Sequence, residues 1–419
     1  MVEKLTLENG VRIVYEQIPH VRSASLGLWL GVGSRYESAA ENGASHYIEH
    51  LLFKGTRHRT AAELAEDMDA IGGQMNAFTT RECTCFYGRV LDTHIRKATD
   101  ILTDMLFHSN FHQEDIEGER GVICEEIDMY EDSPEDLVSD QLIEAVYPGS
   151  SLGAPILGTR ESLAGLDREK LLAYMGTHYR PDRLVVALSG SFTAGDLDYI
   201  QKAFSAMEAG EPITPAPAGY IPAFTLREKA IEQNHLCLLM PGLPMDHKDR
   251  YAAQLFSNIL GGGMSSRLFQ SVRETHGLCY SVYTFGTTFR DAGLFGVYTA
   301  LNQETEQKAL ALIMDILRNL RETGVTGPEL DRAREQVKST VLMSLESTSA
   351  RMNSLGKNEL YRGRVPTPEE IIENYDAVTQ EDVLQIARNL IDFKQLSFSA
   401  VGQVAGEDAY RALIESQRC

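Results

Sequence analysis

Apolar and polar residues alternate at the start of the chain on both sides of Asn9-Gly10, a dipeptide that favours a tight β-hairpin turn. Residues 86–106 and 295–317 each read as an alternating strand, a short polar break and an amphipathic helix. Strands of this kind, followed by helices with one apolar face, are typical of antiparallel sheets covered by helices. The pattern therefore predicts an α+β fold.

The same pattern occurs twice, about half a chain length apart. The Lys-Ala pair that begins at Lys97 recurs at Lys308, 211 residues later. Gly190 and Gly402, each at the end of a strand-like run, are 212 residues apart. Two matches at nearly one offset predict two similar, duplicated domains, each an antiparallel sheet covered by helices. Shared strand and helix periodicity without duplication is the alternative.

A proline-rich stretch separates the two predicted domains. Residues 208–222 contain four prolines and few apolar anchors, a composition typical of a stiff, extended linker. We therefore expect an N-terminal domain at residues 1–210, a linker at 211–222 and a C-terminal domain at 223–419.

The composition narrows the expected partners and compartment. Asp and Glu number 60 against 39 Lys and Arg, a formal charge of -21, so neither nucleic acid nor an anionic membrane is an expected partner. The charge can attract basic peptides, although solubility alone explains most of it. The six cysteines form no C-x-x-C pair, which favours a reducing compartment. No apolar run approaches the roughly 18 residues of a membrane span and the first residues lack a signal core, so we expect a cytoplasmic protein.

The stretch A-S-H-Y-I-E-H, residues 44–50, carries the main candidate chemistry. His46 and His50 are four residues apart, so in a helix they lie on one face, one turn above the other. Gly43 before the stretch and Gly55 after it predict the start and the end of that helix. Two imidazoles so placed can share one metal ion. A helix that carries two surface histidines is the alternative.

Glu49 lies beside His50 and could reach a metal-bound water rather than the metal itself. A catalytic site also needs at least one further protein ligand, with a position left open. The acid-rich stretch 113–147, which predicts helix with a break before Pro134, offers several carboxylates. Composition does not choose among them.

Several motifs occur in a fixed order along the chain, beginning with His-x-x-Glu-His, the order of an inverted zincin. The others are F-K-G-T (53–56), N-A-F-T-T-R-E (76–82), E-R-G-V-I-C-E-E-I (119–127), L-G-G-G-M-S-S-R-L-F (260–269) and R-E-T-H-G-L-C-Y (273–280). Together they resemble the pitrilysin/insulinase metallopeptidase family. The half-length members are the most similar, namely the bacterial processing peptidases and the β subunit of the mitochondrial processing peptidase. The resemblance covers nearly the whole chain.

The resemblance implies one zinc ion per chain, bound by His46, His50 and Glu126. It also implies that Glu49 is the general base, which takes a proton from the zinc-activated water and passes it to the leaving amine. Glu119 matches a second acidic position of the family and is expected to orient a ligand or the bound water. A solvated surface glutamate is the alternative for Glu119.

Substrate contacts are implied in both predicted domains. Asn76 and Ala77 match an edge-strand segment that binds substrate main chain. Phe53 matches an apolar residue near the pocket for the residue after the cut, or belongs to the core. Arg273 and Tyr280, in the C-terminal domain, match an Arg/Tyr pair that contacts substrate and stabilises the charge of the transition state.

These features predict a zinc metalloendopeptidase that hydrolyses extended peptides or unfolded segments. The alternative is a non-catalytic scaffold or partner subunit of a peptidase or respiratory-type complex. Full-length relatives enclose their site with two halves, each like this chain, so the resemblance also implies a homodimer. In that dimer Arg273 and Tyr280 act on the partner's site, and a heterodimer is the other possibility.

Overall fold

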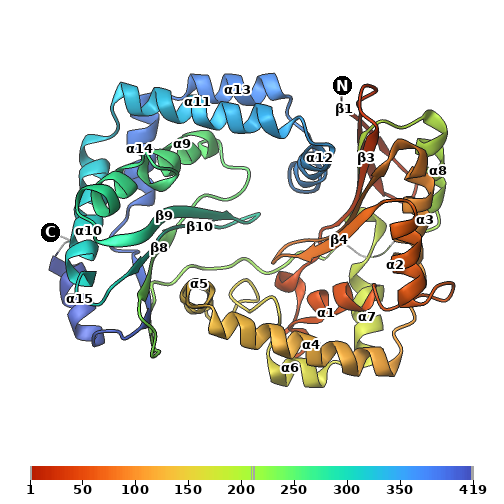
Figure 1. The fold of residues 1–419 in the computed structure, drawn as a ribbon, viewed down its shortest axis with the longest axis horizontal. Helices are drawn as coiled ribbons and strands as arrows, with labels where there is room; N and C mark the ends of the chain where they lie inside the picture. The colour runs from red at the N-terminus through yellow and green to blue at the C-terminus, as the bar shows by residue number, and fades with distance from the viewer. Residues whose placement is uncertain (1, 209, 211–212, 417–419) are drawn as a thin grey trace. The chain divides into compact units, whose positions relative to one another are not determined.

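A computed structural model describes residues 2–208, 210 and 213–416 (Figure 1). Residues 211 and 212 of the predicted linker lie outside this part. Contacts within the chain define two compact units, and neither is continuous in sequence. Unit 1 consists of Met1–Asp128, Ser150–Ala216 and Leu342–Pro366, and unit 2 of Met129–Gly149, Pro217–Val341 and Thr367–Cys419. The predicted domain boundaries, which assume one continuous segment per domain, stay a prediction.

Unit 1 is built on a six-stranded sheet with the order β1-β2-β6-β3-β5-β4. Its first two strands form the hairpin predicted around Asn9-Gly10, where Gly10 adopts a φ of 98°. β2 and β6 run parallel, and the other neighbours are antiparallel. The strands are β1 (Val2–Thr6), β2 (Arg12–Gln17), β3 (Ser23–Leu30), β4 (Gln74–Thr79), β5 (Thr84–Leu91) and β6 (Leu184–Gly190).

Helices cover both faces of this sheet. One face packs on an apolar core shared with α1, α3 and α8. The other face packs on α12, where Met352 lies against the Trp29 indole. Gly356 permits this approach, because a Cβ there would stand 2.3 Å from the indole nitrogen. The helices are α1 (Ala44–Leu51), α2 (Ala61–Ala70), α3 (Ile95–His108), α4 (Gln113–Asp132), α6 (Arg160–Gly165), α7 (Arg168–His178), α8 (Ala194–Phe204) and α12 (Thr348–Arg362), with short 3-10 turns at Ser34–Tyr36, Ala39–Glu41, Asp92–His94 and Pro181–Arg183.

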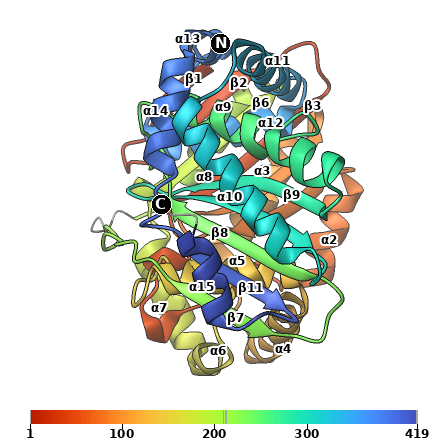
Figure 2. The ribbon, with the colours of Figure 1, turned by 90° about the vertical axis from the view of Figure 1, so that its left-hand side faces the viewer.

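Unit 2 is built on a five-stranded sheet with the order β7-β11-β8-β10-β9, of which Figure 2 shows β11 between β7 and β8. β7 and β11 run parallel, and the other neighbours are antiparallel. The strands are β7 (Phe224–Glu228), β8 (Asn234–Pro241), β9 (Cys279–Thr288), β10 (Gly293–Leu301) and β11 (Ser397–Gly402). The helices are α5 (Pro134–Val146), α9 (Arg250–Gly261), α10 (Glu306–Thr323), α11 (Gly327–Ser344), α13 (Pro368–Ala377), α14 (Gln380–Leu390) and α15 (Glu407–Ser416), with a π-helical turn at Phe269–Thr275.

The two units repeat one fold, as predicted. Without the extra strand β1, the two strand orders match position by position, including the single parallel pair. Gly190 and Gly402 end equivalent strands with φ angles of 127° and 141°. A Cβ would stand 2.2 Å from the Ser23 carbonyl oxygen in one case and 2.3 Å from the Asn234 side chain in the other. The duplicated α+β prediction is confirmed, except that each sheet contains one parallel pair.

The repeats also exchange a helix. α5 follows α4 in the first half of the chain, yet it packs on β8 and β11 of unit 2. α12 follows α11 in the second half, yet it packs on β3 and β6 of unit 1. The break before Pro134 between α4 and α5 is confirmed. In the part of the chain that the structure describes, no helix is both long and apolar enough to cross a membrane.

Candidate metal centre

The histidine-bearing helix α1 begins at a buried carboxylate. Its N-cap is Gly43, with a φ of 94° and no side chain to cap the helix. Glu37 replaces that cap: its two oxygens accept hydrogen bonds from the backbone N–H groups of Gly43 (2.7 Å) and Ser45 (2.8 Å). Burial raises the pKa of the Glu37 carboxyl, and the hydrogen bonds from Ser45 and Gly43 act in the opposite direction. Glu37 thereby fixes the first turn, one residue before His46.

The helix ends earlier than its sequence predicts. α1 stops at Leu51, and a turn follows in which the N–H groups of Phe53 and Lys54 bond to carbonyls of the last helical turn. Gly55, predicted as the stop signal, has a φ of 115° but pairs with Thr60 in an isolated bridge. That prediction was wrong because the positive φ at Gly55 forms the next loop rather than ending the helix.

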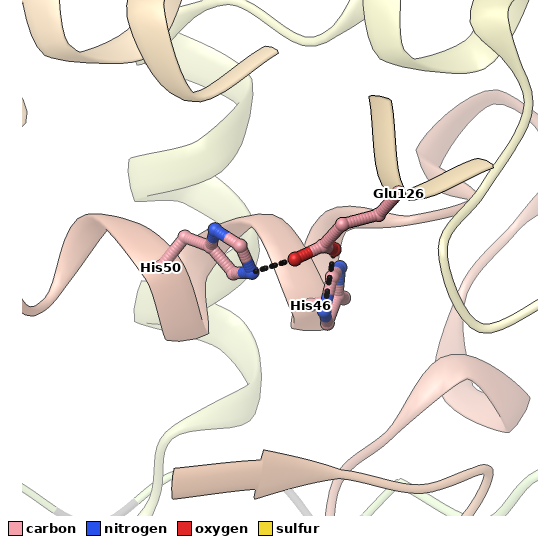
Figure 3. Close-up of side chains that lie close together, drawn as sticks. All are labelled: His46, His50 and Glu126. Atoms are coloured by element: carbon pink, nitrogen blue, oxygen red, sulfur yellow. Dashed lines mark ion pairs between the residues drawn. The ribbon is translucent and has the colours of Figure 1, made fainter. Parts of the chain in front are cut away.

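Three predicted ligands come together at one point in unit 1. His46 and His50 lie one turn apart on α1, with ring centroids 4.6 Å apart. Glu126, on α4, directs one carboxylate oxygen to each imidazole, with Oε2 3.7 Å from His46 Nε2 and Oε1 3.7 Å from His50 Nε2 (Figure 3). One ligand atom from each residue lies within 4.8 Å of the others.

The donor set fits a zinc ion. Two imidazole nitrogens and one carboxylate oxygen are ligands that zinc accepts, and three protein ligands leave a position for water or substrate. Burial, and next the neighbouring His50, lower the pKa of His46 to about 4. His46 is therefore neutral at pH 7, which is the protonation state that binds a metal.

Glu119 contacts His50 at Nδ1, the ring nitrogen opposite the one near Glu126. Its Oε2 lies 2.9 Å from His50 Nδ1, and its Oε1 lies 2.7 Å from the Lys54 ammonium. The side chain is buried. Burial alone would raise the pKa of Glu119, but Lys54 and His50 outweigh it and hold the pKa below its usual value. The buried Glu119 carboxylate therefore contacts both His50 and Lys54, and the solvated-glutamate alternative does not fit this environment. Its role in orienting a ligand stays a prediction.

Glu49 lies on the same helix and is held by a residue that sequence reasoning missed. The Thr79 hydroxyl, at the end of β4, donates a hydrogen bond to Glu49 Oε2. Burial raises the pKa of the Glu49 carboxyl, although Thr79 and His50 act in the opposite direction. Thr79 lies inside the motif N-A-F-T-T-R-E, so its sequence position was the available signal.

The predicted substrate contacts of unit 1 lie on β4 and after α1. Asn76 and Ala77 belong to β4, the last strand of the sheet order, which pairs with β5 on one side. Phe53 is half-buried against the core, with its ring centroid 6.5 Å from that of Phe86. This environment favours the core interpretation of Phe53, and its role at a pocket stays a prediction.

Arg273 and Tyr280 lie side by side in unit 2. The Arg273 guanidinium lies over the Tyr280 ring at 4.8 Å and over the Phe269 ring at 4.6 Å. Stacking of this kind orients the guanidinium. Tyr280 is 75% exposed. The sequence predicted the Arg/Tyr pair but not Phe269.

The protein has a duplicated α+β fold, and two histidines and a glutamate converge in its first unit as a candidate metal site. This combination is that of a metalloprotein class whose family the sequence identifies. Residues 12–160 match Insulinase (Peptidase family M16), and residues 165–337 match Peptidase M16 inactive domain. The chain belongs to peptidase family M16.

Relatives carry the name of zinc protease. The chain is 44% identical to an uncharacterized zinc protease of Bacillus subtilis over 93% of this chain and 96% of the relative. It is 40% identical to an uncharacterized zinc protease of Streptomyces coelicolor over 98% of this chain and 91% of the relative. Both names support a zinc-dependent peptidase.

Solved structures share the fold at low sequence identity. A peptidase M16 inactive domain from Pseudomonas fluorescens superposes with a TM-score of 0.89 at 20% identity, covering 97% of this chain and 99% of that one. A chain of Complex III2 from Candida albicans superposes with a TM-score of 0.85, also at 20% identity, covering 99% and 100%. At this identity the likeness establishes the fold alone.

Proposed function

We propose that the protein is a zinc metalloendopeptidase that hydrolyses extended peptides or unfolded segments. The observation that carries the proposal is the convergence of His46, His50 and Glu126, with Glu49 on the same helix. Membership of a peptidase family whose relatives are named zinc proteases supports it. The proposed content is one zinc ion per chain.

Each side chain of the site has a distinct role in the proposed hydrolysis of a peptide bond. When bound, zinc supplies a Lewis acid that lowers the pKa of water and polarises the scissile carbonyl. Glu49 accepts the proton of the attacking water and delivers it to the leaving amine. The Thr79 hydroxyl holds one oxygen of Glu49 and so limits the rotation of this carboxylate. Glu119 keeps the His50 ring in place while charge develops.

Substrate binding is assigned to an exposed strand edge and to the Arg/Tyr pair. β4 carries Asn76 and Ala77 and is the last strand of its sheet in the part of the chain that the structure describes. Its outer edge can add an extended peptide as a further strand through main-chain hydrogen bonds. Binding of this kind selects peptide shape more than side chains. The stacked Arg273 and Tyr280 supply donors for a peptide carbonyl or for the developing anion.

The proposed assembly is a homodimer in which Arg273 and Tyr280 of each copy act on the zinc site of the other. It rests on the family resemblance, since full-length relatives fuse two halves, each like this chain, around one enclosed chamber. A heterodimer with a different M16 chain is the alternative. The proposed compartment is the cytoplasm.

A non-catalytic scaffold is the second candidate function, because a chain of Complex III2 from Candida albicans has the same fold. Metal analysis together with hydrolysis of a diverse peptide library separates the two functions. The peptidase predicts bound zinc, cleavage of unstructured peptides, loss of cleavage with a chelator and recovery with added zinc. Zinc-loaded protein that cleaves no peptide would favour the scaffold.

A further inference from the structure

A second group of metal-ligating side chains lies in unit 1, outside the candidate catalytic centre. His58, Asp104 and His108 each offer a ligand atom within 4.8 Å of the other two. Among the residues that the structure describes, none of the three belongs to the zinc motif or forms a hydrogen bond or ion pair with the ligands of that motif. The proposed peptidase mechanism leaves this group unused.

Two of the three residues are placed by helix geometry. Asp104 and His108 are four residues apart at the C-terminal end of α3, so their side chains lie on one face of that helix, one turn apart. This spacing is the same as that of His46 and His50 on α1. An imidazole and a carboxylate at this spacing can bind one cation together.

The third residue comes from a loop that is fixed to the end of α3. Thr56 pairs with Ser109 in an isolated bridge, and the Arg57 N–H donates a 2.9 Å hydrogen bond to the His108 carbonyl. The loop therefore holds His58 beside α3. His58 Nδ1 lies 2.6 Å from Asp104 Oδ1, and its ring centroid lies 4.9 Å from that of His108.

The two oxygens of Asp104 have different partners. Oδ2 accepts a hydrogen bond from the Thr56 hydroxyl at 2.8 Å and pairs with the Arg59 guanidinium. Oδ1 faces His58. Arg59 is bound to Oδ2, and a carboxylate oxygen has two lone pairs, so Oδ1 keeps one for a cation beside its contact with His58.

The charged side chains around Asp104 are also compatible with a bound cation. Arg59 is shared among Asp104, Asp67 and Asp100, and Lys97 pairs with Asp67. Three carboxylates thus face two cationic side chains, so the cluster retains surplus negative charge. A divalent ion would be attracted to this point rather than repelled.

An ordinary hydrogen-bonded pair is the competing explanation. A His58–Asp104 pair alone accounts for the 2.6 Å contact, but it gives no reason for a second imidazole at the same point. Two imidazole nitrogens with one carboxylate oxygen form the same type of donor set as the candidate catalytic centre. Such a set suits zinc, copper or nickel, whereas magnesium and calcium prefer oxygen ligands.

We propose that His58, Asp104 and His108 form a second transition-metal site, which takes Zn²⁺ and fastens the 55–60 loop to the end of α3. The site lies close to the surface, since His58 is exposed. The proposal does not depend on peptidase activity.

Calorimetric titration with Zn²⁺ tests the site in a full-length parent variant, His50→Ala with Glu126→Gln, which lacks two ligands of the first site. The parent is expected to bind about one Zn²⁺ per chain and to melt at a higher temperature with Zn²⁺. Mg²⁺ should give neither binding heat nor a shift of the melting temperature. Adding His108→Ala should abolish the saturable heat and the thermal shift. Adding His20→Ala, at an exposed histidine outside the cluster, should change neither.

Two outcomes would overturn the proposal. One is a folded parent, as judged by circular dichroism, that binds no Zn²⁺. The other is equal loss of binding in the His108→Ala and His20→Ala backgrounds, which would indicate nonspecific surface coordination. If the parent does not fold, the titration is made on zinc-loaded wild-type protein. We expect wild type to bind a second equivalent of Zn²⁺ and the His108→Ala variant not to bind it. Failure of wild type to bind a second equivalent would refute the site.

Discussion

We expect Glu119 to act through His50, because it contacts the Nδ1 atom of that ring while Glu126 lies near the Nε2 atom. Lys54 holds the other oxygen of Glu119, so the carboxylate stays ionised and in place. Carboxylates in this position fix the tautomer and orientation of a metal-binding histidine. The same residue could not be distinguished from a solvated glutamate by sequence, because burial and the Lys54 contact depend on the packing of α4.

Glu119→Gln is expected to lower zinc affinity by about 10–100-fold while the protein stays folded. Glutamine is similar in shape but lacks the charge that His50 and Lys54 require. Chelator competition measures the affinity. Glu117→Gln, at an exposed position on the same helix, is the matched control and should change nothing. Unchanged affinity in Glu119→Gln would show that Glu119 has no role in zinc binding.

The start of α11 illustrates how an element is stabilised in unit 2. Thr326 and Glu329 hydrogen-bond reciprocally, the Glu329 carboxylate accepting from the Thr326 N–H at 2.8 Å. The Arg267 guanidinium adds a 2.8 Å contact to the same carboxylate. The Arg267 hydrogen bond is the main reason that the pKa of Glu329 falls to about 2.

Glu329→Gln should lower the free energy of unfolding at pH 7 by about 2 kcal/mol, less than the full pKa shift implies because the carboxylate is partly exposed. A lowered carboxyl pKa stabilises the fold above the unfolded-state pKa, and that stabilisation is lost as pH falls toward 2. Urea unfolding at several pH values measures the difference. It should shrink below about pH 4, and Glu322→Gln, exposed near the end of α10, should show no such effect. A pH-independent difference would contradict this origin.

The sequence predicted the presence of helices and strands more readily than the residues at which they end or the elements that they contact. Local pattern sufficed for the Asn9-Gly10 hairpin and for the break before Pro134, because turn chemistry and proline act within a few residues. The end of α1 at Leu51 was missed, since Gly55 shapes a loop that pairs with Thr60.

Residues that contact a site from a distant part of the sequence were the most difficult to predict. Spacing alone indicated His46 and His50, but Glu126 came only from family resemblance. Glu37 and Thr79 reach α1 from other elements. The motif marked the position of Thr79, but neither contact with α1 can be read from a single sequence.

The acidity of the whole molecule predicts a salt-dependent substrate preference. At a formal charge of -21, long-range attraction should speed the encounter with basic peptides. For extended peptides matched in length, kcat/KM for a basic one should exceed that for an acidic one at low salt. The ratio should fall as ionic strength screens the charges. A ratio independent of salt, or rapid cleavage of compact folded proteins, would count against this view.

The proposed dimer predicts recovery of activity between two inactive chains. Glu49→Gln is mixed with Arg273→Ala, Tyr280→Phe under conditions of subunit exchange. Random pairing makes about half of the dimers mixed, each with one intact site of two, so about a quarter of wild-type activity should return. If Arg273 and Tyr280 serve their own chain, every site carries a defect. No recovery despite demonstrated exchange would refute the shared site.

The most direct test of the central claim is a paired measurement on Glu49→Gln: zinc content and peptide hydrolysis in the same preparation. Glutamine keeps the shape of the side chain and can still accept the Thr79 hydrogen bond, but it cannot take a proton from water. We expect wild-type zinc content, an unchanged melting temperature and almost no hydrolysis. Hydrolysis near the wild-type rate by zinc-loaded Glu49→Gln would contradict the assignment of Glu49 as the base.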